Sequence, residues 1–278
     1  MNRKRSLPLP VSDLYRRKRR FVAQPQQQLQ QPQQDEKAVD SEDGLWNSEL
    51  PDSSFPNDAE ATMLYLKDLF PVEKFQSRLP PIIVKHQLYS MITNRTLADK
   101  QLGELRTRGD VRMFKMSTSE ADEFCLVFTE DYKRHVILHT VKSGANLALV
   151  ERFFDTVIKE CPDISFDKQK LMTQYKFKEE EIHQLIKCGV LNTRDVGSWW
   201  LSIPDLGIFI KSFLRGRKAV ITMIRKSKYR EILQQDLETR KLPKVARLGM
   251  MYHIHDIIGA DLVDWICTTS GRLLRLTE

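Results

Sequence analysis

Apolar residues from position 59 onward recur at helix and strand spacings, and the order of these patterns repeats along the chain. In the first stretch, apolar positions three and four residues apart predict helices over 63–70, over 80–91 after a Pro-Pro pair, and over 96–105. Two apolar runs at 111–116 and 124–129, separated by a polar link, predict a β-hairpin. Three helices closed by a hairpin are the plan of a winged helix, in which a helix-turn-helix carries a β wing.

The second stretch repeats this plan without repeating the sequence. A helix is expected over 147–158, a short strand over 164–166, and helices over 168–175 and 179–187. The apolar residues of the last helix fall on one face. Strand patterns within 190–203, separated by a turn, then predict another wing.

The third stretch starts with a long helical pattern over 208–237, which Gly216 is expected to split into two helices. A strand over 247–252, a helix over 254–267 and a last strand over 272–276 follow. The three stretches together predict an α+β fold, mainly helical, of three tandem winged-helix domains.

The first 57 residues differ in composition from the rest. A basic block is followed by a glutamine-rich stretch over 24–34 and an acidic stretch over 35–58. None of these contains enough apolar surface to offset the entropy lost on ordering. We therefore expect a disordered tail over 1–57, followed by winged-helix domains over 58–140, 141–207 and 208–278.

Two clusters of basic residues in this tail stand ten residues apart, which is the layout of a two-part nuclear import signal. Their members are Arg3, Lys4, Arg5, Arg16, Arg17, Lys18, Arg19 and Arg20. A DNA-binding arm without sequence preference, or a solvated run of charge, is the alternative interpretation. The pattern favours a nuclear, chromatin-associated protein.

Positive charge is concentrated in one segment of the third stretch. The whole chain has a net charge of +7, whereas residues 211–247 contain twelve basic and three acidic residues. Lys218 and Arg225 lie seven residues apart and share a helix face, opposite the apolar Val220 and Ile224. Such a face would contact the phosphates of double-stranded DNA, with steeply salt-dependent binding. The candidate DNA-binding residues are Lys211, Arg215, Arg217, Lys218, Arg225, Lys226, Lys228 and Arg240.

Enzymatic motifs are missing from the sequence. No two glycines stand two residues apart, so there is no GxGxxG loop, and HRD, DFG, GxxxxGK[ST], HExxH and GxSxG are also lacking. The four cysteines form no CxxC pair, and His253 and His255 lack further clustered ligands. We therefore expect no catalytic residue, no cofactor and no metal site. No apolar run approaches the ~20 residues of a membrane span, so no membrane contact is expected.

Three long segments carry a resemblance to a known family. They read PPIIVKHQLYSMITNRTLADKQLGELRTRGDVRMF, GVLNTRDVGSWWLSIPDLGIFIKSFLRGRKAVITMIRKSKYREIL and YHIHDIIGADLVDWICTTSGRLLRL. The chain over 60–278 thereby resembles the serine/threonine-protein kinase 19 family, whose name is misleading. The resemblance implies three winged helices that bind double-stranded DNA, with contacts at Lys211, Arg225, Lys228 and Arg240.

The resemblance also implies a role in transcription-coupled nucleotide excision repair. The implied partners are stalled RNA polymerase II, transcription-coupled repair proteins and the helicase complex that opens the lesion. Two other interpretations stay open: a winged-helix module that binds only proteins, and, least favoured, an atypical serine/threonine kinase. The sequence leaves open whether the protein forms a homodimer.

Overall fold

The computed structural model describes residues 57–117 and 122–277. These residues fall in one compact unit, bounded by Ser54 and Glu278. The tail that precedes Asn57, with its two basic clusters and its glutamine-rich stretch, lies outside the described residues. Among the described helices, none combines the length and the apolar character needed to cross a bilayer.

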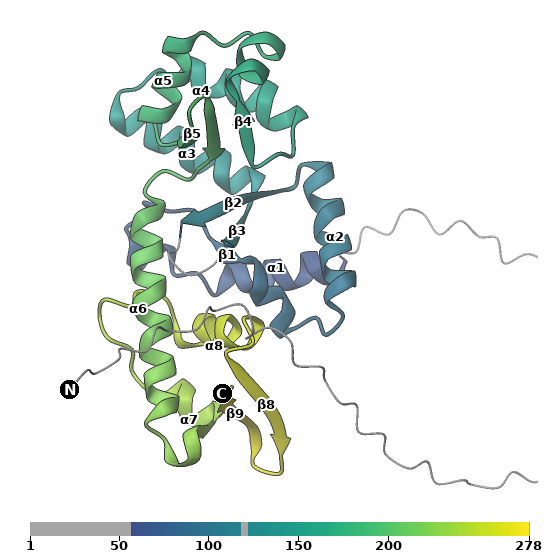
Figure 1. Cartoon of the computed structure of the whole chain (residues 1–278). Coiled ribbons are helices and arrows are strands. Elements are labelled where there is room, and N and C mark those ends of the chain that lie inside the picture. The colour runs from purple at the N-terminus through teal and green to yellow at the C-terminus, as the bar shows by residue number, and fades with distance from the viewer. Residues whose placement is uncertain (1–56, 118–121, 278) are drawn as a thin grey trace, which may run out of the picture. The chain divides into compact units, whose positions relative to one another are not determined.

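The first stretch forms helices around a small antiparallel sheet of strand order β1-β3-β2 (Figure 1). The Asn94 side chain caps α2 by accepting a hydrogen bond from the N–H of Leu97 at 3.1 Å, and Gly109 ends this helix at a φ of +87°, which favours glycine. The elements are α1 (Asp58–Asp68), η2 (Val72–Phe75), β1 (Ile83–Val84), η3 (Lys85–Ser90), α2 (Arg95–Arg108), β2 (Val111–Ser117) and β3 (Asp122–Phe128).

The second stretch has the same sheet topology, β4-β6-β5, and begins with a helix that the sequence analysis missed. This helix, α3, covers Thr129–Ser143 and follows β3 directly. The other elements are α4 (Leu147–Phe153), η4 (Phe154–Ile158), β4 (Ser165–Asp167), η5 (Lys170–Gln174), α5 (Glu179–Lys187), β5 (Leu191–Asp195) and β6 (Ser198–Leu201).

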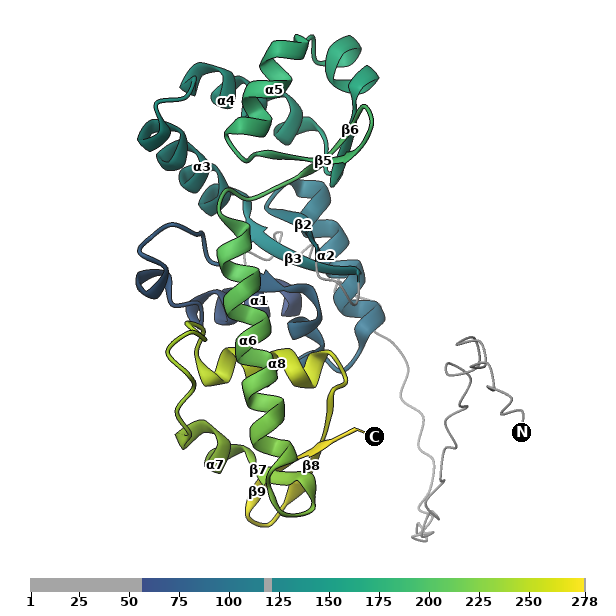
Figure 2. The ribbon, with the colours of Figure 1, turned by 60° about the vertical axis from the view of Figure 1, so that its left-hand side comes forward.

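The third stretch again has one short strand beside a hairpin, in the order β7-β9-β8. Both views show its first helix, α6, crossing α8 (Figures 1 and 2). The elements are α6 (Leu206–Arg225), η6 (Lys228–Arg230), β7 (Glu231–Leu233), α7 (Gln234–Thr239), α8 (Met250–Gly259), β8 (Val263–Thr268) and β9 (Gly271–Leu276).

Buried apolar side chains join the three stretches. The largest cluster contains Phe70 from the first stretch, Phe153 from the second, and Phe209 and Tyr252 from the third. The Tyr252 hydroxyl also donates a hydrogen bond of 2.8 Å to the carbonyl oxygen of Ile82. This cluster therefore joins the three stretches, while the first and the third stretch each keep a smaller apolar cluster of their own.

The α+β class is confirmed, but several predicted elements are wrong. Residues 80–91 form a two-residue strand and a 3₁₀ helix, 247–252 contain no strand, and the helix expected over 254–267 ends at Gly259. Gly216 does not split α6. It lets the helix approach α8 instead, since a Cβ at this position would lie 1.9 Å from Nε2 of His253.

Two expected domain boundaries fall inside helices. The boundary between 140 and 141 lies within α3, and the boundary between 207 and 208 lies in the first turn of α6. Residues 54–278 form a single compact unit, so a division of this part of the chain into three domains stays a prediction.

Candidate nucleic-acid interface

One face of α6 carries a row of cations. Lys211, Arg215, Lys218 and Arg225 follow one another at steps of four, three and seven residues, so they lie on one side of the helix. All four are exposed. The row, which we call the cationic stripe, is about 21 Å long at 1.5 Å per residue.

The opposite face of α6 explains why the stripe stays in solvent. Phe209, Phe213, Val220 and Ile224 are fully buried and pack into two of the apolar clusters. Burial of a large apolar side chain contributes about 1.5–3 kcal/mol, so this face fixes the rotation of the helix. The charged residues are thereby directed outward.

The charge of the stripe is not neutralised by neighbouring carboxylates. Within residues 57–117 and 122–277, none of its four side chains forms an ion pair. Two basic residues of α2 differ in this respect, because Arg95 pairs with Asp261 and Arg108 pairs with Asp110. Uncompensated cations in a row are the feature that attracts a polyanion.

The turn after α6 extends the positive surface. Lys226 and Lys228 are both exposed at the end of the helix, where cations also interact favourably with the helix dipole. Tyr229 and Arg230 follow with φ of 58° and 57°, and this strained turn leaves Tyr229 76% exposed. The Lys228 ammonium stands 5.0 Å from the centroid of the Tyr229 ring.

Arg240 lies apart from the helix, on the segment between α7 and α8. This segment and Lys74 line a groove of about 700 Å³, which Lys241 and Lys244 make strongly basic. The Arg247 N–H donates a hydrogen bond of 2.8 Å to Oγ of Ser212, which follows the first residue of the stripe. The groove is therefore anchored beside the start of the stripe.

Arg217 does not belong to this surface, contrary to the sequence prediction. Its side chain is only 15% exposed and donates hydrogen bonds to Asp256 at 2.6 and 2.8 Å and to Glu123 at 2.6 Å. Burial opposes its charge, but these two carboxylates outweigh burial and raise the pKa of Arg217. Its charge is already balanced by buried partners, so Arg217 joins α6 to α8 and β3.

Asp256 is the centre of this buried cluster. It is fully buried, and Nε2 of His86 lies 2.6 Å from its Oδ1. Burial alone would raise the pKa of Asp256, but the hydrogen bonds from Arg217 and the contact with His86 lower it, with His253 nearby at 4.0 Å. The cluster holds an ionised carboxylate inside the protein.

The helices that precede the second and third hairpins are poorly suited to enter a DNA groove. Every residue of α8 from Tyr252 to Gly259 is buried, and Gly259 packs closely on the backbone of His86. The corresponding helix α5 begins with Glu179, Glu180 and Glu181. Phosphates would be repelled there. Neither of these two helices therefore presents an exposed, positively charged surface like that of the cationic stripe.

The two remaining histidines of interest have structural partners. His253 is buried against Gly216, and Nδ1 of His255 lies 2.8 Å from Oγ of Ser90. Burial, followed by the charge of Arg272, lowers the pKa of His255. In the part of the chain that the structure describes, no three His, Cys, Asp or Glu residues are grouped so that they could hold a metal ion.

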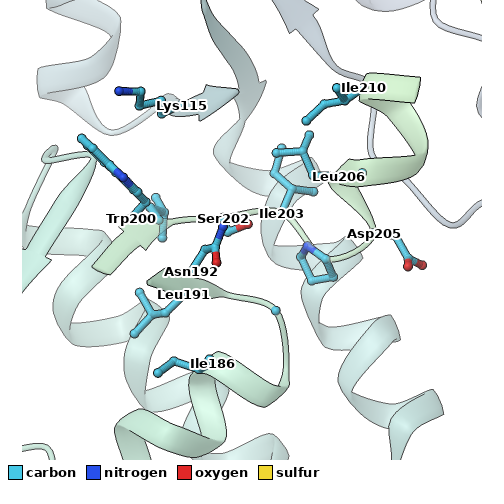
Figure 3. A pocket seen from close by; sticks show the side chains of 14 residues that line it. Lys115, Ile186, Leu191, Asn192, Trp200, Ser202, Ile203, Asp205, Leu206 and Ile210 are labelled. Atoms are coloured by element: carbon cyan, nitrogen blue, oxygen red, sulfur yellow. The ribbon is translucent and has the colours of Figure 1, made fainter. Parts of the chain in front are cut away.

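A pocket of about 370 Å³ lies at the start of α6 (Figure 3). Trp200 of β6 and Lys115 of β2 lie on one side of it, and Leu206 and Ile210 of α6 on the other. The Lys115 ammonium stands 5.0 Å from the centroid of the Trp200 ring. The sequence analysis missed Lys115 because nothing in the sequence pairs a residue of the first hairpin with one of the second.

Comparison with known proteins assigns the chain to a family. Residues 55–276 match the model of the family described as inactive serine-threonine protein kinase 19. The chain belongs to this family. The match covers nearly all of the described residues. The word "inactive" in the family description agrees with the expected lack of catalysis.

Individual relatives carry two kinds of name. Winged helix repair factor 1 of Homo sapiens is 44% identical over 223 residues, which are 80% of this chain and 87% of the relative. Its namesake from Xenopus laevis is 42% identical over 237 residues, 85% of this chain and 90% of the relative. Serine/threonine-protein kinase mug51 of Schizosaccharomyces pombe is 28% identical over 213 residues, 73% of this chain and 68% of the relative.

Proposed function

We propose that this protein is a non-enzymatic DNA repair factor that holds double-stranded DNA by its phosphate backbone. The observation that carries the proposal is the cationic stripe, a row of uncompensated cations about 21 Å long on a rigid helix. Lys226, Lys228 and Arg240 extend the proposed contact surface, whereas Arg217 is left out of it.

The proposed architecture is three winged-helix units over 58–128, 129–205 and 206–277. Each unit contains one three-stranded antiparallel sheet in which a short strand pairs with the second strand of a hairpin. Helices precede each hairpin, as the winged-helix plan requires. The relatives named winged helix repair factor 1 support this interpretation.

The proposed setting is transcription-coupled nucleotide excision repair in the nucleus, on chromatin. In this setting the protein would stand beside stalled RNA polymerase II and bind transcription-coupled repair proteins, including the repair helicase complex. The support is the repair role in the names of the relatives and the two basic clusters within Arg3–Arg20. Positioning of DNA and proteins, rather than bond chemistry, is the proposed activity.

A protein-only module is the second candidate. The edge strand β8 favours it, because Trp265 is 44% exposed and Ile266 is 39% exposed on the third hairpin. Exposed edge strands pair readily with other chains. In this case the cationic stripe would meet an acidic protein instead of DNA.

A salt series with duplex DNA separates the two candidates. The full chain is compared with Arg225→Glu, which reverses one charge of the stripe, and with Lys100→Glu, which makes the same charge change at an exposed residue of α2. We expect binding that weakens steeply with salt, strongly reduced by Arg225→Glu and little changed by Lys100→Glu. Equal effects of the two substitutions, or no binding at low salt, would refute the proposed surface.

A further inference from the structure

We propose that Tyr229 stacks on an unpaired base, so that the protein binds a duplex interrupted by mismatched bases more tightly than a fully paired duplex. This inference rests on the proposed function, since it places the ring beside the end of the cationic stripe. Tyr229 belongs to η6, the turn between α6 and β7. The end of α6 that leads into this turn lies beside the third sheet (Figure 2).

The turn holds Tyr229 in a backbone conformation that residues other than glycine rarely adopt. Tyr229 and Arg230 lie one after the other in the left-handed region, at φ of 58° and 57°. The Arg230 N–H donates a hydrogen bond of 3.1 Å to the carbonyl oxygen of Ser227, and Oγ of Ser227 donates one of 3.0 Å to the carbonyl oxygen of Met223. Strain of this kind persists only where the surrounding structure fixes it, and it clusters at binding sites.

The ring that this backbone presents has little contact with the fold. Tyr229 is 76% exposed, and among the large apolar and aromatic side chains that the structure describes only Val196 is more exposed. Burial of the ring therefore does not compensate for the strain of the turn. The ring is available to a ligand.

Lys228 suits the ring to a nucleotide. Its ammonium stands over the Tyr229 ring, 5.0 Å from the centroid. Because the side chain is so exposed, the opposite face of the ring is accessible to a base. Stacking on aromatic rings combined with cations along the phosphate backbone is how proteins hold unpaired strands. A base on Tyr229 would leave its own phosphate within reach of Lys228.

Negative charge next to the turn is already balanced. Residues 225–230 contain no acidic residue, and the first carboxylate after them in the sequence belongs to Glu231. Its Oε1 accepts a hydrogen bond of 2.5 Å from Nε of Arg275 on the neighbouring strand β9. The approach of a phosphate to the turn is therefore not opposed by this carboxylate.

The surroundings of Tyr229 favour nucleic acid over a protein partner. Aromatic residues at the centre of a protein–protein interface sit in a patch that is apolar and poor in charge. Tyr229 is instead the only apolar or aromatic residue within 225–230, where four exposed cations surround it in the sequence. They are Arg225, Lys226, Lys228 and Arg230.

The preference for unpaired bases follows from the structure of DNA. Tyr229 comes four residues after Arg225, the last member of the stripe, so a duplex bound along α6 would bring its bases near the ring. In a fully paired duplex, the faces of each base are covered by its neighbours in the stack. Opening the stack costs free energy, and this cost is lowest at a mismatched or damaged base. The ligand class is thus a duplex that contains unpaired bases.

The test compares a fully paired duplex with a duplex of equal length in which two adjacent base pairs are replaced by mismatches, one of which contains 2-aminopurine. Both duplexes carry the same number of phosphates, so their attraction to the stripe is matched. We expect the mismatches to tighten binding of the full chain about 5- to 30-fold, and the fluorescence of 2-aminopurine to fall as the base stacks. Tyr229→Leu keeps every charge and should remove both effects.

Two further variants show whether stacking is the cause. Tyr229→Phe keeps the aromatic ring and should keep the preference for mismatches together with the fall in fluorescence. Trp265→Leu removes another exposed ring that lies beside a cation, since Arg272 stands 4.7 Å from its centroid. Trp265 lies on β8, away from the turn in the sequence, so this variant should also keep the preference.

The outcomes separate this inference from the proposed function. Binding of the paired duplex without a gain from the mismatches, or a gain that survives in Tyr229→Leu, overturns the inference and leaves the proposed function standing. Loss of binding to an acidic repair protein in Tyr229→Leu, with DNA binding unchanged, would assign the ring to a protein interface and overturn the inference. No binding of the native chain to either duplex at low salt overturns both.

Discussion

Removal of Arg217 should destabilise the protein rather than weaken its contact with DNA. Replacement by leucine deletes the cation that balances Asp256, which is 0% exposed, and Glu123, whose side chain is 12% exposed. Loss of one member of a buried ion pair costs about 3–5 kcal/mol, because the remaining charge stays desolvated. In a unit of this size, each kcal/mol lowers the melting temperature by about 2–4 °C, so we expect a decrease of about 6–20 °C.

Thermal melting followed by circular dichroism measures this effect, and a second substitution tests its cause. Arg217→Leu combined with Asp256→Leu removes both charges and should recover much of the lost stability. At a temperature where it is folded, Arg217→Leu should bind duplex DNA about as tightly as the native chain. Unchanged melting together with a large loss of DNA affinity would refute the structural role and return Arg217 to the DNA surface.

Three further predictions concern salt, packing and pH. If five phosphates are contacted, the slope of log affinity against log salt should be about −4.5, and Arg225→Ala should reduce its magnitude by about one unit. Gly216→Ala should lower the melting temperature despite the better helix propensity of alanine, because the new methyl group meets the buried His253; an increase would show that α8 can shift. Burial lowers the pKa of His135 to about 4, below its unfolded value of about 6.5, so stability should fall as pH drops between these values. His135→Gln should flatten this dependence in urea unfolding at several pH values, and an unchanged slope would contradict it.

Amphipathic helices and hairpins could be predicted where one face is apolar and the other polar, as in α2 and α5. The missed helix α3 breaks this rule, because the polar His135 and Thr140 are buried while Leu138 and Val141 are 51% and 60% exposed. In α8 the burial of consecutive residues removes the periodicity that separates a helix from a strand.

The proposed DNA surface could be predicted only as a set of charges. The spacing of Lys218 and Arg225 placed these two residues on one helix face. The structure adds Lys211 and Arg215 to that face, because α6 continues through Gly216. Arg217 has the same charge, but its side chain points inward and donates to Glu123 and Asp256. These partners stand far from Arg217 in the sequence, so local spacing does not reveal the pairing. Pairing between distant segments, which also creates the Lys115–Trp200 pocket, leaves no local signal.

The shared apolar cluster of Phe70, Phe209 and Tyr252 has a consequence for genetics. A premature stop codon between α6 and α8 would remove Tyr252 and expose both phenylalanines, together with the carbonyl of Ile82 that Tyr252 binds. The shortened product would fail quality control and be degraded, so its phenotype would resemble a complete deletion of the gene. Missense alleles on the exposed face of α6 would instead leave a normal amount of protein that has lost one contact.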